Sequence, residues 1–347
     1  MSLSGTADVM TALRIERPHE VAVVRVPRPV PRPGSVLVRT ALVGLCGTDL
    51  ELLHGTAAYL QDGRAAYPVL PGHEWTGSVV TPGAEFAVGE RVVGHTMLHC
   101  GYCRMCLRGR RTFCERLREV GLYGHPGAAA EYVAMPEGSL SRVPQGVGDR
   151  AAALTEPAVT VAGGLEQARC RLADRVAVIG TGTMGLLAVQ LAARTAGLVD
   201  AVGIDPAGLE LAVRCGARRG LTPGQAARSE LGRYSLVVEA SGAASAFRLG
   251  LDLLEPGGRL AVIGVAGAAV EAFVPGELAL RGLEVIGVRH GLDHYDRTLR
   301  LFREGVLDAD PLVAEVLPLT EGPRAFELLG GGRSGPPKIL LDFGGTR

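Results

Sequence analysis

The chain has 347 residues, a length that exceeds one ordinary hydrophobic core and favours two domains. Its 36 basic and 36 acidic side chains cancel, so the sequence offers no basic stripe for nucleic acid or an anionic membrane. No apolar run is long enough to cross a bilayer, and the first residues lack the charged and apolar regions of a signal peptide. The sequence therefore predicts a two-domain cytoplasmic protein.

Short strands separated by turns dominate the first part of the chain. Runs rich in β-branched residues at Val21–Val26, Ser35–Val43 and Arg91–Val93 alternate with proline–glycine turns. Helical periodicity is scarce until Asp149, where the sequence Asp-Arg-Ala-Ala-Ala-Leu is typical of a capped helix start. The pattern predicts an irregular β-barrel domain over residues 1–155.

Four cysteines with the spacing C-x2-C-x2-C-x7-C lie in this first domain: Cys100, Cys103, Cys106 and Cys114. Four thiolates at short spacings can close a tetrahedral zinc site, and the flanking arginines favour the thiolate form that binds metal. Two disulfides or chance clustering are the alternatives, but seven cysteines in all do not suggest a secreted disulfide framework. Without an open position for substrate, the zinc predicted in this lobe (about residues 95–115) is structural.

Apolar strands alternate with helical stretches from Arg175 onward, which predicts an α/β unit with a parallel, doubly wound sheet over residues 156–292. The predicted strands are Val176–Ile179, Ala201–Ile204, Leu236–Glu239, Leu260–Ile263 and Val285–Val288. The remaining residues, 293–347, contain one predicted amphipathic helix, Tyr295–Glu304, and one predicted strand, Lys338–Phe343. We expect this tail to return to the first domain.

A glycine-rich turn with the pattern G-x-G-x-x-G follows the first of these strands and opens a helix. It consists of Gly180, Thr181, Gly182, Thr183, Met184 and Gly185. One such match is weak evidence among 49 glycines, but Asp205 follows twenty residues later, as in dinucleotide sites. The helix N-terminus can bind the pyrophosphate, and Asp205 can bind the adenosine ribose and would repel a 2′-phosphate. The pattern predicts NAD rather than NADP; a strand–helix turn without a ligand is the alternative.

Three later strand ends are expected to complete the cofactor wall, because ligands of open α/β sheets bind at the carboxyl ends of the strands. Each of them could instead be an ordinary strand end. The candidate residues are Ser241, Ile263, Gly264, Val265, Gly287 and Val288.

Residues of metal-ligand type also occur outside the four-cysteine lobe. Cys46 lies in L-C-G-T-D, His73 and Glu74 lie in P-G-H-E-W, and Glu156 lies in T-E-P. A thiolate, an imidazole and one or two carboxylates would make an open zinc site with a position for water or substrate. Each residue alone has a simpler explanation, as an inert buried thiol, a turn histidine or a helix cap. Spacing alone does not join them.

Together, these motifs resemble those of the zinc-dependent medium-chain alcohol/polyol dehydrogenase family (sorbitol, threonine or 2-deoxy-scyllo-inosamine dehydrogenase-like), from Leu13 to Phe343. The resemblance implies a GroES-like β-barrel followed by a Rossmann domain, with NAD and two zinc ions per chain. It implies a catalytic zinc on Cys46 and His73, with Glu74 as a ligand or exchanging with water. Glu156 stands where simple alcohol dehydrogenases carry a second cysteine and sorbitol- or threonine-type members carry glutamate. The four cysteines would hold the structural zinc.

The resemblance also implies a mechanism. Zinc would lower the pKa of a substrate hydroxyl, Thr48 would accept its proton, and hydride would pass to the nicotinamide. Asp49 would orient the metal loop rather than react. Many relatives carry a relay histidine five residues after the first cysteine ligand, but this chain has Glu51 there. Either Glu51 relays the proton with the cofactor ribose, or it faces the substrate.

The predicted substrate is a secondary hydroxyl of a polyol, sugar or cyclitol. The glutamate in place of cysteine makes the zinc site harder, and His54, Arg289 and His290 could bind neighbouring hydroxyls. An amino-hydroxy acid such as threonine is the alternative substrate. A zinc-free quinone or enoyl reductase would lack the four-cysteine lobe, and a nucleotide-sensing zinc protein without catalysis would need a basic surface. A homodimer or homotetramer is expected.

Overall fold

The computed structural model describes residues 8–265, 269, 273–332 and 334–344, and the chain divides into two compact units. The first unit contains Met1–Glu156, Glu315–Gly332 and Lys338–Arg347; the second contains Pro157–Ala314 and Arg333–Pro337. The C-terminal tail was predicted to return to the first domain from residue 293. Residues 293–314 instead belong to the second unit, and the chain returns to the first unit at Glu315. No helix within the described residues is both long and apolar enough to span a membrane.

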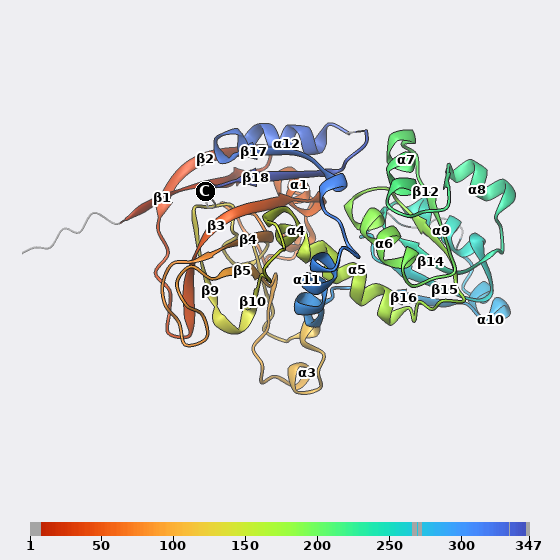
Figure 1. The fold of residues 1–347 in the computed structure, drawn as a ribbon, viewed down its shortest axis with the longest axis horizontal. Helices are drawn as coiled ribbons and strands as arrows, with labels where there is room; N and C mark the ends of the chain where they lie inside the picture. Colours follow the sequence, from red (N-terminus) through yellow and green to blue (C-terminus); the bar gives the residue numbers. More distant parts are fainter. Residues whose placement is uncertain (1–7, 266–268, 270–272, 333, 345–347) are drawn as a thin grey trace, which may run out of the picture. The chain divides into compact units, whose positions relative to one another are not determined.

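A seven-stranded sheet forms the centre of the first unit. Strand β3 (Ser35–Leu45) pairs antiparallel with β4 (Glu74–Val79), β9 (Tyr132–Pro136) and β18 (Lys338–Asp342). The sheet is completed by β5 (Arg91–Gly94), β10 (Leu140–Arg142) and β17 (Val313–Pro318). Figure 1 shows the C-terminal strand β18 (blue) beside β3 (red-orange), although the two are far apart in sequence, and β17 follows β18 at the edge of the sheet.

The first unit also contains smaller elements. They are β1 (Val9–Arg17), β2 (Glu20–Pro27), β6 (Met97–Leu98), β7 (Arg118–Val120), β8 (Gly124–His125), α1 (Gly47–His54), α2 (Ala58–Gln61), α3 (Arg104–Leu107), α4 (Asp149–Ala153), α12 (Gly322–Gly330), η1 (Arg111–Phe113), η2 (Glu137–Ser139) and η5 (Leu319–Glu321). Nearly every residue of β3 is buried, which explains its continuous apolar sequence rather than a polar alternation. The β-rich first domain that the sequence predicted is confirmed.

The second unit contains a six-stranded parallel sheet with the order β13-β12-β11-β14-β15-β16. Its strands are β11 (Arg175–Ile179), β12 (Leu198–Val202), β13 (Gly220–Leu221), β14 (Tyr234–Glu239), β15 (Leu254–Val262) and β16 (Glu284–Gly287). Numbered from β11, this is the order 3-2-1-4-5-6 of the dinucleotide-binding Rossmann fold. The predicted doubly wound parallel sheet is confirmed.

From α5 to α10 the helices of this unit alternate with its strands, and η3, α11 and η4 follow β16. They are α5 (Thr155–Gln167, whose first two residues belong to the first unit), α6 (Thr183–Ala193), α7 (Pro206–Arg214), α8 (Pro223–Ser229), α9 (Ala244–Leu253), α10 (Gly276–Arg281), α11 (Tyr295–Arg303), η3 (Leu292–His294) and η4 (Asp310–Leu312). Helix α6 is buried from Gly185 to Ala192, as expected for a helix that is apolar on all sides.

Two local predictions differ from the structure. The strand expected at Ala201–Ile204 is β12, Leu198–Val202, and Ile204 is 87% exposed beyond its end. The tail was expected to hold one helix and one strand, but it also holds β17 and α12. Both are short, and α12 begins with Gly-Pro, so neither gives a long periodic signal.

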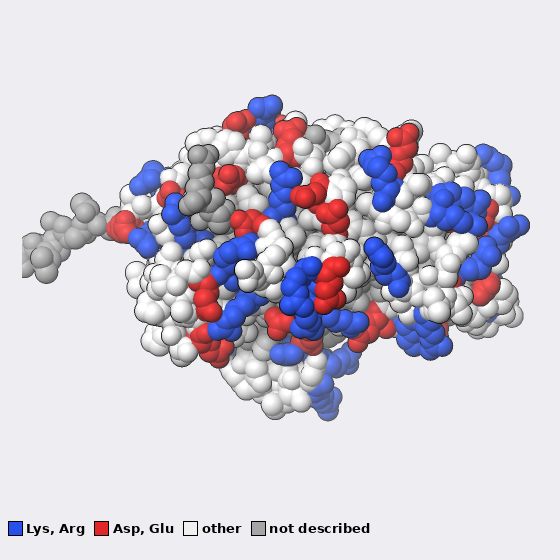
Figure 2. Space-filling view, in the orientation of Figure 1, with Lys and Arg blue, Asp and Glu red and all other residues white. Residues whose placement is uncertain are grey.

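Figure 2 shows charged side chains of both signs on this face of the protein, together with broad uncharged areas. This distribution agrees with the zero net charge of the sequence.

Candidate metal centres and cofactor site

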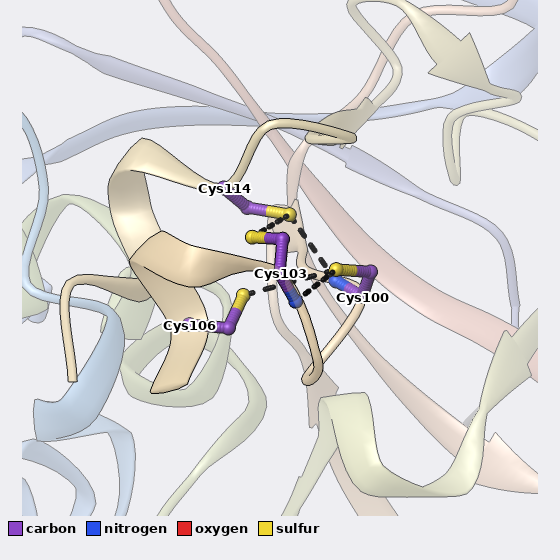
Figure 3. A group of neighbouring side chains, drawn as sticks. All are labelled: Cys100, Cys103, Cys106 and Cys114. Carbon is purple, nitrogen blue, oxygen red and sulfur yellow. Dashed lines mark hydrogen bonds between the residues drawn. The ribbon is translucent and has the colours of Figure 1, made fainter. Parts of the chain in front are cut away.

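The four cysteines of the lobe lie with their sulfur atoms turned toward one another (Figure 3). The Sγ atoms of Cys100 and Cys106 are 4.0 Å apart, and those of Cys103 and Cys114 are 3.9 Å apart. A tetrahedron with Zn–S bonds of about 2.3 Å has edges of about 3.8 Å, whereas a disulfide bond is about 2.05 Å long. The arrangement therefore fits a tetrathiolate metal site and not a pair of disulfides.

Backbone N–H groups also prepare these sulfurs for metal. Cys103 N–H donates to Cys100 Sγ, and Cys100 N–H donates to Cys114 Sγ, each over 3.3 Å. Hydrogen bonds from the backbone lower the pKa of Cys103 to about 6, whereas burial raises the pKa of Cys106 to about 12. Four thiolates so close together would repel one another unless a cation lay between them. A divalent metal would supply that cation and thereby stabilise the loop.

The second group of candidate ligands begins at the N-terminus of α1. Cys46 is the N-cap residue, and its Sγ accepts a hydrogen bond from Thr48 N–H over 3.3 Å. Asp49 completes a capping box, because its Oδ2 accepts from Cys46 N–H over 2.9 Å. The motif C-G-T-D therefore folds as a helix cap in which cysteine takes the usual place of serine or threonine. This local structure fixes the position of the Cys46 thiol.

His73 joins this cap to the sheet. Its Nε2 lies 3.0 Å from Cys46 Sγ, and its Nδ1 lies 3.6 Å from Asp49 Oδ1. His73 Nδ1 and Asp49 Oδ1 are buried and form no hydrogen bond with other described residues. Burial alone would lower the pKa of His73, but Cys46 and Asp49 raise it well above its usual value. The pocket therefore favours a positive charge at this point.

The carboxylates of Glu74 and Glu156 also lie close to His73. Ligand atoms of His73, Glu74 and Glu156 lie within 4.8 Å of one another, and the same holds for Cys46, Asp49 and His73. Glu74 is the first residue of β4, and Glu156 is the second residue of α5. His73 belongs to both groups, so the structure brings all the predicted catalytic-metal residues together.

Lys338 is a partner in this group that the sequence analysis missed. Its Nζ donates to Glu74 Oε1 and Oε2 over 2.9 and 2.7 Å, and to Leu45 O over 3.0 Å. Burial would lower the pKa of Lys338, but Glu74 raises it, so the side chain remains an ammonium. The neighbouring Gly44 leaves room for the pair, because a β-carbon there would lie 2.5 Å from Glu74 Oε2. The available signal was that Lys338 is the only lysine in the chain.

The charges of the group test whether it fits a metal. Asp49, Glu74 and Lys338 are buried, and Glu156 is half-buried. Three carboxylates and a thiol thus face the Lys338 ammonium and the His73 imidazole, and the carboxylates outnumber these two groups. An excess of buried negative charge is unfavourable without a further cation. Sulfur, imidazole nitrogen and carboxylate oxygen are the ligand types that zinc prefers. The residues present therefore fit a zinc ion.

Two predicted proton-transfer residues, Thr48 and Glu51, and the predicted substrate contact His54 follow along α1. Thr48, Glu51 and His54 are spaced by three residues and share one helix face, which spans about 9 Å from the first to the last. Glu51 is exposed, yet surrounding protein raises the pKa of its carboxyl. His54 lies at the far end of the helix, where its ring is 5.3 Å from that of His19. Thr48 is thus the member of this set nearest to the Cys46 cap.

The glycine turn of the second unit has the geometry of a phosphate site. Gly180 has a φ of +112°, and a β-carbon on Gly185 would clash with the Gly180 carbonyl oxygen. Space for a β-carbon at Gly182, the N-cap of α6, is open, so a ligand could approach the backbone there. No side chain caps α6, which leaves the N–H groups of its first turn, including Thr183 and Met184, for an anion.

Asp205 lies at the N-terminus of α7 rather than at the end of a strand. Its carboxylate accepts hydrogen bonds from the N–H groups of Ala207 and Gly208 over 3.3 and 2.9 Å. It also accepts from Ser334 Oγ over 2.6 Å and from Gly335 N–H over 2.9 Å. The Ser334 and Gly335 donors, followed by those of the helix, lower the pKa of Asp205. The Asp205 carboxylate is therefore ionised, and it already accepts hydrogen bonds from other groups of the chain.

Glu239 holds the later turns of the predicted cofactor wall. Its Oε1 accepts from Ser241 N–H over 2.8 Å and from the Ser241 hydroxyl over 2.5 Å. Its carbonyl accepts from the N–H groups of Ile263 and Gly264, which joins the two turns. Val265 is 84% exposed beyond them. Ser241 thus supports the turn, a role that its place in the sequence did not reveal.

The remaining predicted residues lie on or after β16. Val288 is buried, and its side chain, like that of Ile263, lies beside Gly164 of α5. Gly287 is exposed at the end of the strand. Arg289 is also exposed, whereas His290 is buried with its ring 6.2 Å from that of Tyr295.

Comparison with known proteins agrees with both units. Residues 32–145 match the family described as "alcohol dehydrogenase GroES-like domain", and residues 183–304 match the family described as "zinc-binding dehydrogenase". The chain is 31% identical to an L-threonine 3-dehydrogenase of Anaeromyxobacter sp. (strain K), over 92% of this chain and 94% of the relative. It is 30% identical to an erythritol/L-threitol dehydrogenase of Mycolicibacterium smegmatis, over 96% and 97% of the two chains.

A solved structure with the same fold comes from Sinorhizobium meliloti 1021 and is described as a zinc-binding dehydrogenase bound to NADP. Its TM-score is 0.89 with 28% identity, and the match covers 96% of this chain and 99% of that one. A GroES-like unit with metal-ligand clusters and a Rossmann unit define a medium-chain dehydrogenase. The chain belongs to the zinc-dependent medium-chain alcohol/polyol dehydrogenase family.

We expect Cys103→Ser to destabilise the lobe, because a structural metal site contributes directly to folding. Bound zinc should fall by one ion per chain, and the thermal midpoint should fall by several degrees. Metal analysis and calorimetry would measure both, with Cys215→Ser, outside the lobe, as the control. An unchanged zinc content in Cys103→Ser would show that the lobe does not hold metal.

We expect Lys338→Met to lower the free energy of unfolding by about 3–5 kcal/mol, because Glu74 would be left buried without its partner. Adding Glu74→Gln should restore part of this loss, since the uncompensated charge disappears. Denaturant unfolding of the single and double variants measures the coupling. The control is Arg64→Met, which breaks an exposed pair with Asp62 and should change little. If Lys338→Met lowered the free energy of unfolding by the same amount with and without Glu74→Gln, Lys338 would not be the partner that compensates the charge of Glu74.

Proposed function

We propose that the chain is a zinc-dependent dehydrogenase that transfers hydride between NAD and a secondary hydroxyl of a polyol, sugar or cyclitol. The observation that carries this proposal is that His73 belongs to two groups of ligand atoms, one with Cys46 and Asp49 and one with Glu74 and Glu156, so that carboxylates accompany one thiol and one imidazole. Such a donor set makes a harder and more polar metal site than one with two thiolates. Substrates with several hydroxyls suit that setting.

In this proposal Cys46, His73 and Glu156 hold the catalytic metal, and Lys338 restrains Glu74. Zinc bound there supplies a Lewis acid that makes a substrate hydroxyl easier to deprotonate. Thr48 accepts the proton, because its hydroxyl can accept and donate at once and its backbone is attached to the Cys46 cap. Glu51, one turn further along the same helix face, would receive the proton from Thr48. Asp49 orients the metal loop, because its Oδ2 accepts a hydrogen bond from Cys46 N–H.

The cofactor is proposed to bind to the second unit. NAD supplies the hydride acceptor when it is bound. The free N–H groups of α6 bind its pyrophosphate, and Asp205 binds the adenosine ribose. The ionised Asp205 would repel a 2′-phosphate, which is the reason for proposing NAD although a similar structure carries NADP. Ser241, Gly264 and Gly287 would line the same edge of the sheet.

A second candidate substrate is an amino-hydroxy acid. The observation in its favour is the 31% identity with an enzyme named L-threonine 3-dehydrogenase. The 30% identity with an erythritol/L-threitol dehydrogenase supports the polyol equally well. In either case His54, Arg289 and His290 are the tentative substrate contacts.

We also propose a homodimer or homotetramer. Strand β16 is the edge of its sheet, and Val285 on it is 39% exposed. Leu280 on the preceding helix α10 is 90% exposed. An open strand edge with exposed apolar side chains is a typical contact surface for a second copy. The cytoplasmic location expected from the sequence stays a prediction.

We expect Cys46→Ser and His73→Ala each to lower kcat by about a thousandfold or more, because the Lewis acid contributes several kcal/mol to the reaction. Bound zinc should fall to one ion per chain, retained by the four-cysteine lobe. Turnover assays and metal analysis would measure this, with Cys170→Ser in the second unit as the control. Substantial activity in either variant would remove that residue from the metal site.

Among candidate substrates, polyols, sugars or cyclitols should exceed simple alcohols in kcat/KM by at least about a hundredfold. A site that binds several hydroxyls rejects analogues that leave its polar groups unpaired. The measurement is a panel of linear polyols, sugars, inositols, aminocyclitols, threonine, ethanol, butanol and benzyl alcohol, each with NAD and with NADP. Higher efficiency with ethanol, butanol or benzyl alcohol would contradict the polyol proposal, and a preference for threonine would select the second candidate.

A further inference from the structure

The carboxylate of Asp205 has no acceptor position left for a ligand. Oδ1 accepts from Ala207 N–H and from the Ser334 hydroxyl, and Oδ2 accepts from the N–H groups of Gly208 and Gly335. A carboxylate offers about four lone-pair sites. The residue predicted to bind the adenosine ribose is therefore fully hydrogen-bonded within the chain itself.

The four donors are not equivalent. Ala207 and Gly208 belong to the first turn of α7, where Asp205 is the N-cap, and these bonds form part of the helix end. Ser334 and Gly335 come from 129 and 130 residues further along the chain. They precede β18 and belong to the second unit, whereas the residues before and after this short segment in the sequence belong to the first unit. Only Ser334 and Gly335 can lose their hydrogen bonds to Asp205 without disrupting the N-terminus of α7.

The two remote donors match what a ribose would offer. The 2′- and 3′-hydroxyls of adenosine ribose are two neighbouring donors, and a carboxylate can accept one on each oxygen. Ser334 supplies one donor to Oδ1, and Gly335 supplies one to Oδ2. The Gly335 N–H is directed by a backbone with φ of +89°, a conformation that favours glycine. Two prolines, Pro336 and Pro337, follow and restrict the backbone of the segment.

We propose that Ser334 and Gly335 form a latch that occupies the ribose position on Asp205, so that a dinucleotide must displace them to bind. The proposal rests on the proposed dinucleotide function and adds a specificity-determining element to that site. A nucleotide with a free 2′,3′-diol can replace both hydrogen bonds of the latch. A nucleotide without the diol cannot replace them, and Asp205 then keeps its internal partners.

The test is equilibrium binding of NAD+ to the zinc-loaded full chain, measured by isothermal titration calorimetry. Ser334→Ala removes one competing donor and should lower the Kd by about three- to tenfold, the range of one hydrogen bond. Ser334→Thr keeps the hydroxyl and should bind like the wild type. Ser229→Ala, in α8 of the same unit, is the matched control and should have no effect. An unchanged or higher Kd in Ser334→Ala would overturn the latch.

A second pair of ligands separates competition from other causes. Adenosine 5′-monophosphate carries the diol, whereas 2′,3′-dideoxyadenosine 5′-monophosphate does not. Ser334→Ala should strengthen binding of the first and leave the second unchanged. An equal gain for both nucleotides would overturn the proposal, because it would show that Ser334 acts through something other than the diol.

Hydrogen exchange at the Gly335 amide gives a readout independent of any substitution. The amide should be protected in the free protein and exchange faster when NAD+ is saturating. Protection that persists with bound NAD+ would overturn the latch while leaving the dinucleotide site in place. Failure of NAD+ to bind the wild type and all variants would instead overturn the proposed function, so the two failures are distinguishable.

Discussion

The buried ion pair between Lys338 and Glu74 is the interaction on which the candidate metal site of the first unit depends. It compensates one of three carboxylates that lie close to Cys46 and His73. Because Lys338 begins β18 and Glu74 begins β4, and both strands pair with β3, the sheet itself sets the distance between the charges. The remaining excess of negative charge is what makes the pocket suitable for a divalent cation. Fold and charge balance are thus linked.

The two candidate metal sites are built in different ways. The four cysteines lie within one short loop, so their convergence depends mainly on local turns and on backbone N–H groups. Cys46 caps a helix, His73 immediately precedes β4, and Glu156 lies in a second helix, so their convergence depends on the whole sheet. A closed local site suits a structural ion, and an assembled site can leave a position open for substrate.

Asp205 connects three functions in one side chain. It caps α7, it is the acidic residue of the dinucleotide pattern, and it binds the Ser334–Gly335 segment. Only Gly335, Pro336 and Pro337 separate Ser334 from Lys338, so the partner of Asp205 and the partner of Glu74 belong to one short stretch of chain. The C-terminal part of the sequence therefore supplies partners to both candidate sites, in addition to the last strand of the sheet.

The sequence by itself determined the features that depend on local spacing: the family, the β-rich and Rossmann units, the four-cysteine loop and the glycine turn. These patterns are readable because each is completed within one turn or one strand–helix unit. Only the tertiary structure decided the pairing of Lys338 with Glu74 and of Ser334 with Asp205, which are 264 and 129 residues apart. It also decided that residues 293–314 pack with the second unit. Such contacts follow from strand order and packing, which no local pattern of residue types specifies.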